Sequence, residues 1–260
     1  MDDATVALAT RIGARPLELE LEEIRDVTRS MRRFRFASDQ LRSFEHRAGQ
    51  DLMLSIAPAP GSDTGRHRRY TIRHLEPLEG EVHLDVVMHG DGPGAKWFGA
   101  ARPGDRIAAV GPRGKVAITP DVSWHLFVGD ETFVAAAFAM SEAVVGPAVS
   151  LHVLCVDAPD DEVAPDDGAV SFGRATRSGV AWVHRGSDAD GGTSLVVSAL
   201  EALELPGGPG HVYIGGEFHM VAAARSALAD RGVIDDAISA KPYWRRDLAN
   251  QDHGEPERGA

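Results

Sequence analysis

The hydrophobic pattern of this 260-residue chain changes after Thr119-Pro120, and the change predicts two folding units. Before that point, short alternating runs are separated by glycine and proline turns, which is typical of a small antiparallel β-barrel. After it, apolar runs alternate with helix-like segments, which is typical of a parallel α/β sheet. We therefore expect a barrel over residues 17–119, an α/β unit over 120–249 and a flexible tail at 250–260.

Both expected units contain segments with the period of their elements. Leu17, Leu19 and Leu21 alternate with glutamates, as in a half-buried strand. The other expected barrel strands are 31–37, 51–57, 68–75, 81–88 and 106–110, and residues 96–101 have a helix-like pattern. The second unit is expected to contain strands at 124–128, 149–156, 181–184 and 211–214, and helices at 131–145, 194–203 and 217–231.

Charge and composition exclude several classes of protein. A net charge of −12 argues against a general nucleic-acid binder, whose binding surface should be basic. No run reaches eighteen apolar residues and the start lacks the regions of a signal peptide, so we expect a soluble, cytoplasmic chain without membrane insertion. The single cysteine, Cys155, excludes disulfide frameworks and Cys-ligated iron–sulfur clusters, and its apolar neighbours predict an inert core residue.

The charge is unevenly distributed between the two expected units. Residues 25–73 contain eleven basic and five acidic residues, whereas residues 121–240 contain five basic and eighteen acidic ones. This difference indicates that the first unit binds an anion, although two solvated faces that differ by chance would give the same numbers.

The segment Arg68-Arg69-Tyr70-Thr71-Ile72-Arg73 has the groups needed to bind an aromatic phosphorylated ligand. On one continuous strand, Thr71 and Arg73 share a face with Arg69, while Tyr70 lies on the other. Arg73 can bind a pyrophosphate through two N–H groups, Tyr70 offers a flat ring, and Thr71 can hydrogen-bond a ring heteroatom. An exposed basic strand without a ligand is the alternative.

The pattern Arg-x-Tyr-Thr-x-Arg at the end of a small barrel resembles the flavin-binding motif of the siderophore-interacting protein family, the FAD-dependent ferric-siderophore reductases. Departures from the family pattern fall at Arg29-Ser30, Ala135 and Asp247. The resemblance extends, in the family's order, over residues 27–33, 88–97, 102–106, 111–114, 129–132, 215–217 and 243–245. It implies a ferredoxin-reductase-like fold that binds FAD in the barrel and NADPH or NADH in the α/β unit. In the barrel, it implies FAD contacts from Arg68, Tyr70, Thr71, Arg73, His89, Gly90, Gly94, Ala95 and Trp97.

The turn Gly92-Pro93-Gly94-Ala95 precedes the helix-like segment. Backbone N–H groups and the positive end of the helix dipole would face a phosphate there, opposite Arg73. The alternatives are an ordinary glycine turn, a His89 that merely caps a strand, and a Trp97 that fills the barrel mouth.

Two further candidate positions follow apolar strands of the second unit, where ligands of open α/β sheets bind. G-x-G-x-x-G is absent, and the resemblance instead implies that a transient nicotinamide nucleotide binds here. Asp130 and Thr132 could equally cap a helix, and Glu217 could stabilise a helix N-terminus without a ligand. The candidate residues are Gly129, Asp130, Glu131, Thr132, Gly215 and Glu217.

The last candidate residues, Lys241, Trp244, Arg245 and Arg246, lie beyond the last expected strand. Cations beside aromatic rings suit an anionic catechol- or hydroxamate-bearing ferric complex, although a solvated charge run is a rival interpretation.

Other catalytic motifs are missing from the sequence. It contains no G-x-x-x-x-G-K-[ST], no G-x-S-x-G and no H-E-x-x-H. His67, His74 and His83 have no carboxylate in clear register, so we expect no metal site. Nor do we expect a catalytic acid, base or nucleophile, because a flavin would carry the electrons.

The sequence therefore predicts an FAD-dependent oxidoreductase that reduces the Fe(III) of a ferric siderophore to Fe(II) with electrons from NAD(P)H or ferredoxin. One alternative is another flavin or ferredoxin-type oxidoreductase on the same scaffold. The other is a non-catalytic flavoprotein that binds a siderophore or senses redox state.

Overall fold

The computed structural model describes residues 3–56, 67–90, 92–163 and 178–246. Its contacts divide the chain into two compact units, Met1–Ala117 and Ile118–Ala260. The expected tail at 250–260 and the last residue of the expected strand 51–57 lie outside the described residues. No helix among the described residues is long and apolar enough to cross a membrane.

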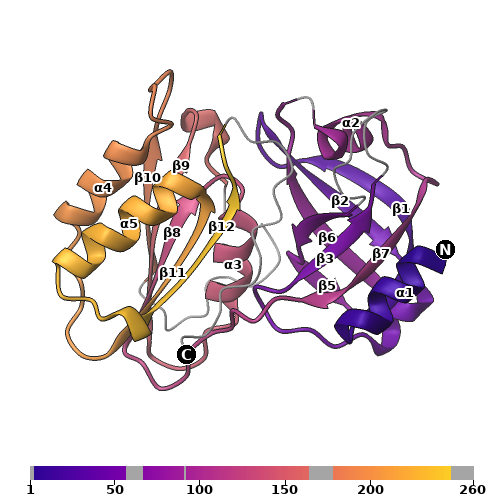
Figure 1. The fold of residues 1–260 in the computed structure, drawn as a ribbon, viewed down its shortest axis with the longest axis horizontal. Coiled ribbons are helices and arrows are strands. Elements are labelled where there is room, and N and C mark those ends of the chain that lie inside the picture. Colours follow the sequence, from indigo (N-terminus) through magenta and orange to yellow (C-terminus); the bar gives the residue numbers. More distant parts are fainter. Residues whose placement is uncertain (1–2, 57–66, 91, 164–177, 247–260) are drawn as a thin grey trace. The chain divides into compact units, whose positions relative to one another are not determined.

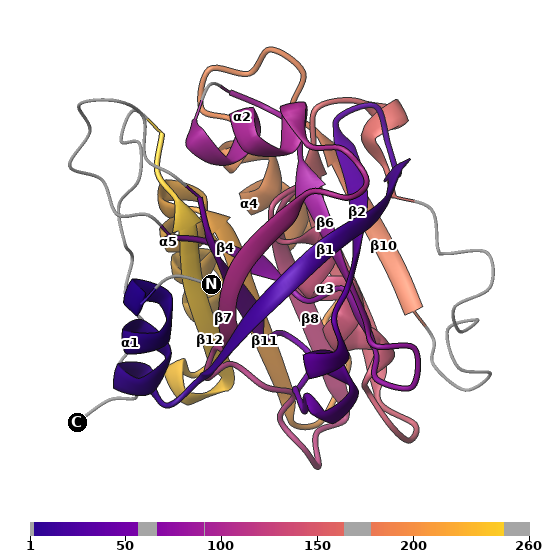
Figure 2. The same cartoon turned by 90° about the vertical axis from the view of Figure 1, so that its right-hand side faces the viewer.

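The first unit is a seven-stranded antiparallel barrel (Figure 2). Its strand order is β4-β3-β7-β1-β2-β6-β5. Only residues 72 and 73 separate β4 from β5, although these strands stand at opposite ends of that order, so the sheet must curl until its ends meet. The strands are β1 (Arg15–Asp26), β2 (Met31–Ala37), β3 (Asp51–Ser55), β4 (His67–Thr71), β5 (His74–Glu76), β6 (Glu81–Val87) and β7 (Arg106–Arg113).

Leucine and phenylalanine side chains fill the barrel. Leu17, Leu19 and Leu21 of β1 are fully buried, as their alternation with glutamates predicts. The 3₁₀ helix η1 (Asp39–Ser43) contributes the buried Leu41. Helix α2 (Pro93–Ala100) follows β6 and buries Phe98 in the same core.

The N-terminal helix α1 (Asp3–Ile12) was not expected from the sequence. It packs beside β7 and β1 through Ala9, which contacts the small apolar cluster around Met53 and Val110 (Figure 2). This docking covers the side of the barrel near β3.

The expected continuous strand over 68–75 is wrong, because the chain leaves β3 at Ile72. The N–H of Ile72 still donates to Gln50 of the β3 side, whereas the N–H of Arg73 donates to His83 of β6 at 2.9 Å. Arg73 therefore does not share a strand face with Arg69. After the break Arg73 lies beside Asp85 of β6, with 4% of its surface exposed.

The second unit is a five-stranded parallel sheet in the order β10-β9-β8-β11-β12. Helices α4 and α5 lie side by side on one face, and α3 covers the other (Figure 1). The elements are β8 (Trp124–Asp130), α3 (Val134–Glu142), β9 (Val149–Val156), η2 (Pro159–Asp161), β10 (Ser178–His184), α4 (Thr193–Ala202), β11 (Gly210–Glu217), α5 (Phe218–Asp230), η3 (Asp235–Ala237) and β12 (Ile238–Trp244).

Strand β12 corrects the expectation that Lys241 and Trp244 lie beyond the last strand. It pairs in parallel with β11, with Lys241 opposite Gly215 and Trp244 opposite Glu217. Its half-buried, partly polar residues hide the strand from an analysis of hydrophobic period. The strand carries these two candidate residues along the edge of the sheet.

The strand order reverses between β8 and β11, because the chain runs outward from β8 to β10 and then returns to β11 on the other side. In open parallel sheets, ligands bind at such a reversal, beyond the carboxyl ends of the strands. Asp130 ends β8 and Glu217 ends β11, so both lie at this position.

Candidate functional site

In the barrel unit, Tyr70 of β4 brings its strand against the first turn of α2. Its ring packs edge-on against Phe98, with ring centroids 4.8 Å apart. A Cβ atom at Gly94 would collide with the Tyr70 hydroxyl, so this close approach requires a glycine. The motifs around Tyr70 and Gly94, more than twenty positions apart in the sequence, therefore form one local surface.

Arg68 lies on the same side of β4, and its Cγ atom is 3.9 Å from the position of a Cβ on Gly94. Burial lowers the pKa of Arg68, and the nearby Tyr70 opposes this shift. Burial also raises the pKa of Tyr70 above its ordinary value. The strand and helix therefore enclose a desolvated positive charge, which an anion would stabilise.

Arg73 belongs to a buried cluster of two guanidinium groups and one carboxylate. Arg33 binds Asp85 through two hydrogen bonds of 2.6 and 2.9 Å. The Nε atom of Arg73 lies 3.9 Å from the same carboxylate. Two guanidinium groups thus lie beside one buried carboxylate in the barrel unit.

The start of α2 offers further groups for an anion. Gly92 precedes the helix and Pro93 opens it, while the N–H of Lys96 already donates to Gly92. The geometry of a helix start leaves the N–H groups of Gly94 and Ala95 without acceptors in the helix. Gly94 itself lies beside the Tyr70 hydroxyl and the Arg68 side chain.

The remaining barrel candidates have separate positions. Thr71 ends β4 and pairs with Asp51. His89 and Gly90 are exposed in the segment between β6 and α2. Trp97 stacks on Phe36, with centroids 6.4 Å apart, which agrees with the packing interpretation. Contacts of all nine barrel candidates with FAD stay a prediction.

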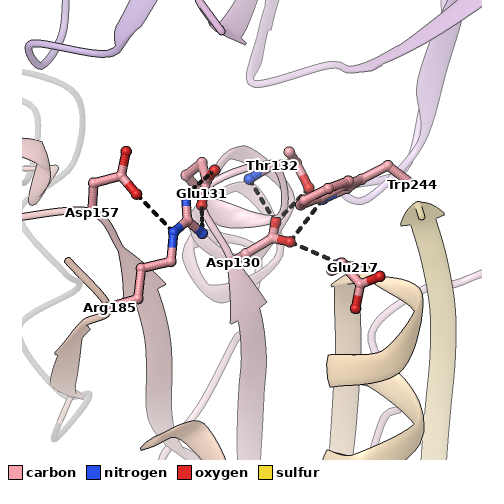
Figure 3. A network of polar contacts seen from close by, with 7 residues as sticks. All are labelled: Asp130, Glu131, Thr132, Asp157, Arg185, Glu217 and Trp244. Atoms are coloured by element: carbon pink, nitrogen blue, oxygen red, sulfur yellow. Dashed lines mark hydrogen bonds and ion pairs between the residues drawn. The ribbon is translucent and has the colours of Figure 1, made fainter. Parts of the chain in front are cut away.

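At the carboxyl edge of the second sheet, Asp130 joins three elements through four hydrogen bonds (Figure 3). Its Oδ1 accepts from the N–H and the hydroxyl of Thr132, at 2.9 and 2.5 Å. Its Oδ2 accepts from the N–H of Glu217 at 2.7 Å and from the indole Nε1 of Trp244 at 2.8 Å. Asp130 thus connects β8 with the start of α5 and with β12.

The environment of Asp130 opposes its ionisation. The carboxyl is fully buried, and burial together with the charge of Glu131 raises its pKa to about 6. Hydrogen bonds from Thr132 and Trp244 act in the opposite direction. Asp130 therefore titrates closer to neutral pH than an ordinary aspartate does.

Glu131 and Arg185 form an ion pair beside Asp130 (Figure 3). Two guanidinium nitrogens of Arg185 donate to the Glu131 carboxylate, each at 2.6 Å, and Nε donates to Asp157 at 2.7 Å. These acidic partners raise the pKa of Arg185 despite its burial. The guanidinium lies between two carboxylates.

Glu217 acts as the N-cap of α5. Its Oε2 accepts from the N–H groups of His219 and Met220, at 2.6 and 3.0 Å. Its Oε1 accepts from the N–H of Arg246 at 3.2 Å. The structural role considered for Glu217 is therefore present. The cap of α3 is different, because Phe133, and neither Asp130 nor Thr132, is its N-cap residue.

Gly129 and Gly215 face each other across β8 and β11. A Cβ at either position would collide with Phe133, so the two glycines make room for this ring. Their contact with a nucleotide stays a prediction.

A pocket of about 310 Å³ opens at this edge of the second unit. It lies beyond the ends of β8, β10, β11 and β12, which includes the reversal of strand order. Its lining residues are Asp130, Arg185, Gly186, Ser187, Asp188, Gly191, Glu217, Trp244 and Arg246.

The C-terminal candidates divide between two environments. Trp244 and Arg246 line the pocket, and Nη1 of Arg246 donates to the carbonyl of Ala189 at 2.5 Å. Arg245 instead lies over the ring of Phe218, 4.9 Å from its centroid. Lys241 is half-buried on β12. A common surface of all four side chains for a ferric chelate stays a prediction.

Among the described residues, no group of three or more His, Cys, Asp or Glu side chains could hold a metal ion. Cys155 is buried, and burial raises the pKa of its thiol to about 12. A thiol with this pKa is a poor nucleophile at neutral pH.

Sequence reasoning missed the residues that follow β9 and β10. Asp157 and Arg185 stand directly after these strands, as Glu131 does after β8. Because the carboxyl ends of neighbouring parallel strands lie together, these positions could have been placed at one edge. Ser187, Asp188 and Gly191 lie in the polar segment before α4, whose glycine pair at 191–192 was the available signal.

Two family models match this chain. The model described as siderophore-interacting FAD-binding domain matches residues 52–116, and the model described as siderophore-interacting protein matches residues 122–247.

Curated relatives align with much of the chain. An uncharacterized protein of Mycobacterium tuberculosis is 32% identical over 206 residues, which are 74% of this chain and 69% of the relative. The ferric vibriobactin reductase ViuB of Vibrio cholerae is 28% identical over 69% of this chain and 64% of its own length. The NADPH-dependent ferric-chelate reductase of Escherichia coli is 26% identical over 68% and 65%, respectively.

Solved structures share the fold. A siderophore utilization protein from T. fusca has a TM-score of 0.78 and 27% identity, over 92% of this chain and 96% of the other. The siderophore-interacting protein SipS from Aeromonas hydrophila has a TM-score of 0.74 and 26% identity, over 90% and 93%. The Amycolatopsis cytochrome P450 reductase GcoB, 21% identical over 88% of this chain and 70% of its own, reaches 0.66, a likeness of fold alone.

Proposed function

Because the chain belongs to the siderophore-interacting protein family, we propose that it is a flavin-dependent oxidoreductase that reduces ferric siderophores and so releases their iron. Its named relatives ViuB and the Escherichia coli enzyme support ferric chelates as the substrate class. The electrons come from a nicotinamide nucleotide, with ferredoxin as the alternative donor.

The observation that carries the proposal is the junction of β4 and α2 in the barrel unit. Tyr70 and the absent side chain of Gly94 bring Arg68 next to the first turn of α2, where N–H groups have no acceptor within the helix. A pyrophosphate needs such a combination of N–H donors and positive charge. These residues therefore fit the diphosphate of FAD, and the guanidinium of Arg73, beside Asp85, is a further group suited to it.

Each side chain has a separate task in this proposal. Arg68 and Arg73 neutralise the phosphates, and the N–H groups of Gly94 and Ala95 donate to them. Tyr70 packs against the cofactor and Thr71 hydrogen-bonds the flavin ring. Bound FAD would supply the redox chemistry, because a flavin accepts two electrons as a hydride and can pass them on singly to ferric ions.

Reduction suits the release of iron from a siderophore. Hard oxygen ligands such as catecholate and hydroxamate hold Fe(III) tightly, and one added electron lowers the charge of the metal that they bind. The protein then needs a cationic surface for the anionic chelate, for which Lys241, Trp244, Arg245 and Arg246 are the proposed residues.

Stopped-flow absorbance tests the proposal with the full-length protein as purified. Mixing with NADH or NADPH should bleach the visible flavin band, and a ferric catecholate or hydroxamate should then restore it. A ferrous-specific dye should report the Fe(II) that forms. Each event is measured separately, so the nucleotide step and the iron step can fail independently.

The alternatives give different traces. Bleaching that no ferric chelate reverses would assign the chain to another flavin reductase. A flavin that neither nucleotide nor reduced ferredoxin bleaches would favour a binding or sensing protein. A protein that neither contains FAD nor takes it up would refute the proposal at its first step.

A further inference from the structure

The chain's own carboxylates bind the helix N-termini at the carboxyl edge of the second sheet. Glu217 accepts from two N–H groups of α5. Asp190 accepts from the N–H groups of Gly192 and Ser194 at the start of α4, both at 2.9 Å. In phosphate-binding sites, such N–H groups donate to the ligand. The starts of α4 and α5 therefore leave few backbone N–H groups that could donate to a phosphate.

One of the two guanidinium groups that line the pocket is bound by carboxylates in the same way. Arg185 donates three N–H groups to Glu131 and Asp157, which carry two negative charges against its one (Figure 3). Arginine side chains in NADP sites bind the 2′-phosphate with their free N–H groups. Arg185 has its charge more than balanced before any ligand arrives.

Counted over the residues that the structure describes, the pocket therefore has an excess of negative charge. Two of these residues are positive, Arg185 and Arg246. Five acidic side chains line the pocket or pair with Arg185: Asp130, Asp188, Glu217, Glu131 and Asp157. Asp188 is exposed at the rim, next to Ser187. Carboxylates and hydroxyls accept hydrogen bonds from ribose hydroxyls, whereas they repel phosphates.

We propose that this pocket selects NADH over NADPH, with Arg185 withheld from the 2′-phosphate by Glu131 and Asp157. The inference rests on the proposed function, because it concerns the nucleotide that reduces the flavin. A 2′-phosphate brings about two further negative charges at pH 7 to a pocket that is already negative. A ribose 2′-hydroxyl adds no charge and can donate to Asp188.

Calorimetry tests the preference without any redox step. The full chain is titrated with AMP (adenosine 5′-monophosphate) and with 2′,5′-ADP (adenosine 2′,5′-bisphosphate), which differ by the 2′-phosphate. AMP should bind at least about tenfold more tightly than 2′,5′-ADP, a ratio that matches repulsion between nearby charges in a half-exposed site. The ratio should shrink as salt rises from low to physiological concentration, because salt screens exposed charges. Flavin reduction by NADH and NADPH should show the same order.

Two variants test which carboxylates cause the preference. Asp188→Asn removes a charge at the rim, and Asp157→Asn removes one of the two negative charges that bind Arg185. Each should tighten binding of 2′,5′-ADP several-fold and change binding of AMP less than twofold. Asp230→Asn is the matched control, because Asp230 is an exposed acid at the far end of α5, about 20 Å from Glu217 along the helix.

Three results would overturn the inference: equal or tighter binding of 2′,5′-ADP, equal effects of Asp188→Asn on both ligands, or reduction of the flavin by neither nucleotide. The proposed function is tested separately by mixing dithionite-reduced protein, freed of excess reductant, with a ferric chelate. Reoxidation would keep ferric-chelate reduction even if the nucleotide inference had failed. Absence of reoxidation would refute the function itself.

Discussion

The hydroxyl of Tyr70 occupies the space in which a side chain at position 94 would begin, so β4 and α2 can meet only because residue 94 is glycine. This contact joins the Arg-x-Tyr-Thr motif to the helix start that is expected to bind the diphosphate of FAD. It also makes the site sensitive to one methyl group.

Gly94→Ala should separate the strand from the helix and weaken FAD binding. Overpacking of this kind costs about 1–3 kcal/mol of folding free energy. FAD content after gel filtration and the thermal midpoint should both fall. The double variant Tyr70→Phe/Gly94→Ala removes the colliding hydroxyl and should recover part of the stability. Gly99→Ala, in the same helix with open space around it, should retain FAD; if it lost as much FAD as Gly94→Ala, the contact would not be the cause.

Arg73→Met should weaken FAD binding while Asp85 keeps its two bonds from Arg33. A charge-assisted contact contributes about 1.5–3 kcal/mol, so the dissociation constant should rise roughly tenfold to hundredfold. Titration of the apoprotein with FAD measures it. Arg69→Met is the control, because Arg69 is bound to Asp51. Equal FAD affinity in the Arg73 variant and the parent would contradict a phosphate role for Arg73.

Asp130→Asn should destabilise the second unit, because an amide cannot accept on both sides as the carboxylate does. Leaving buried N–H groups without acceptors costs about 1–3 kcal/mol. Urea unfolding followed by tryptophan fluorescence measures the stability and also reports the loss of the hydrogen bond from Trp244 to Asp130. The effect should be smaller in a Trp244→Phe background. Asp236→Asn, at an exposed acid of the same unit, should leave stability unchanged; additive effects of Asp130→Asn and Trp244→Phe would argue against the bond.

Acid should destabilise the protein through His152. Burial lowers the pKa of His152 to about 4, whereas an unfolded histidine titrates near 6.5. Between these values the unfolded chain binds a proton that the folded chain does not, so stability is lost as the pH falls from 6.5 towards 4. His152→Phe, which can keep the stack on Phe127, should lose roughly 2 kcal/mol less than the parent between pH 7 and 4.5.

Urea unfolding at several pH values measures this difference. His219→Gln, at an exposed histidine, should follow the parent at every pH. Identical pH profiles of His152→Phe and the parent would show that His152 is not the group that titrates.

Lys241→Ala combined with Arg246→Ala should raise the KM for an anionic ferric chelate with little change in FAD content. The reason is the loss of two positive charges from the proposed chelate surface. Steady-state assays with an anionic and a cationic chelate measure the difference. Arg225→Ala, which removes an exposed arginine paired with Asp235, is the control. An equal fall in turnover for both chelates would contradict an electrostatic role.

Local patterns in the sequence predicted much of the fold. The buried leucines of β1 and the apolar runs of β8 and β9 have the periods of their elements, and the structure contains these strands. The motif at Tyr70 and the glycine turn before α2 were both assigned to one ligand. The structure places them in contact, although only the fold could show that Tyr70 meets Gly94.

Other features depend on partners that are distant in sequence. The break after Ile72 arises because the N–H of Arg73 donates to the carbonyl of His83 on β6. The sequence of residues 68–75 gives no signal of this change of partner. The strand β12 is half-buried and contains Lys241 and Pro242, so its pairing with β11 outweighs its weak pattern. Helix α1 depends on docking against Met53 and Val110.

The acidic network at the second sheet required a different inference. Glu131, Asp157 and Arg185 each follow a strand, and their spacing in the sequence carries no periodic signal. Only the order β10-β9-β8 brings them together. The sequence could identify Glu131 as a candidate nucleotide-binding residue. The structure adds that Glu131 pairs with Arg185 and balances its charge.

Because residues 72 and 73 link β4 to β5, FAD binding should depend on whether the barrel is closed at this link. Ile72 lies in the core and Arg73 lies beside Asp85. The two residues that close the barrel therefore include the arginine that is expected to bind the phosphates of FAD. Any separation of β4 from β5 would move Arg73 away from its position beside Asp85. Release of FAD into the protein-free filtrate during gentle heating should therefore precede global melting. It would identify this link as the first part of the barrel to unfold.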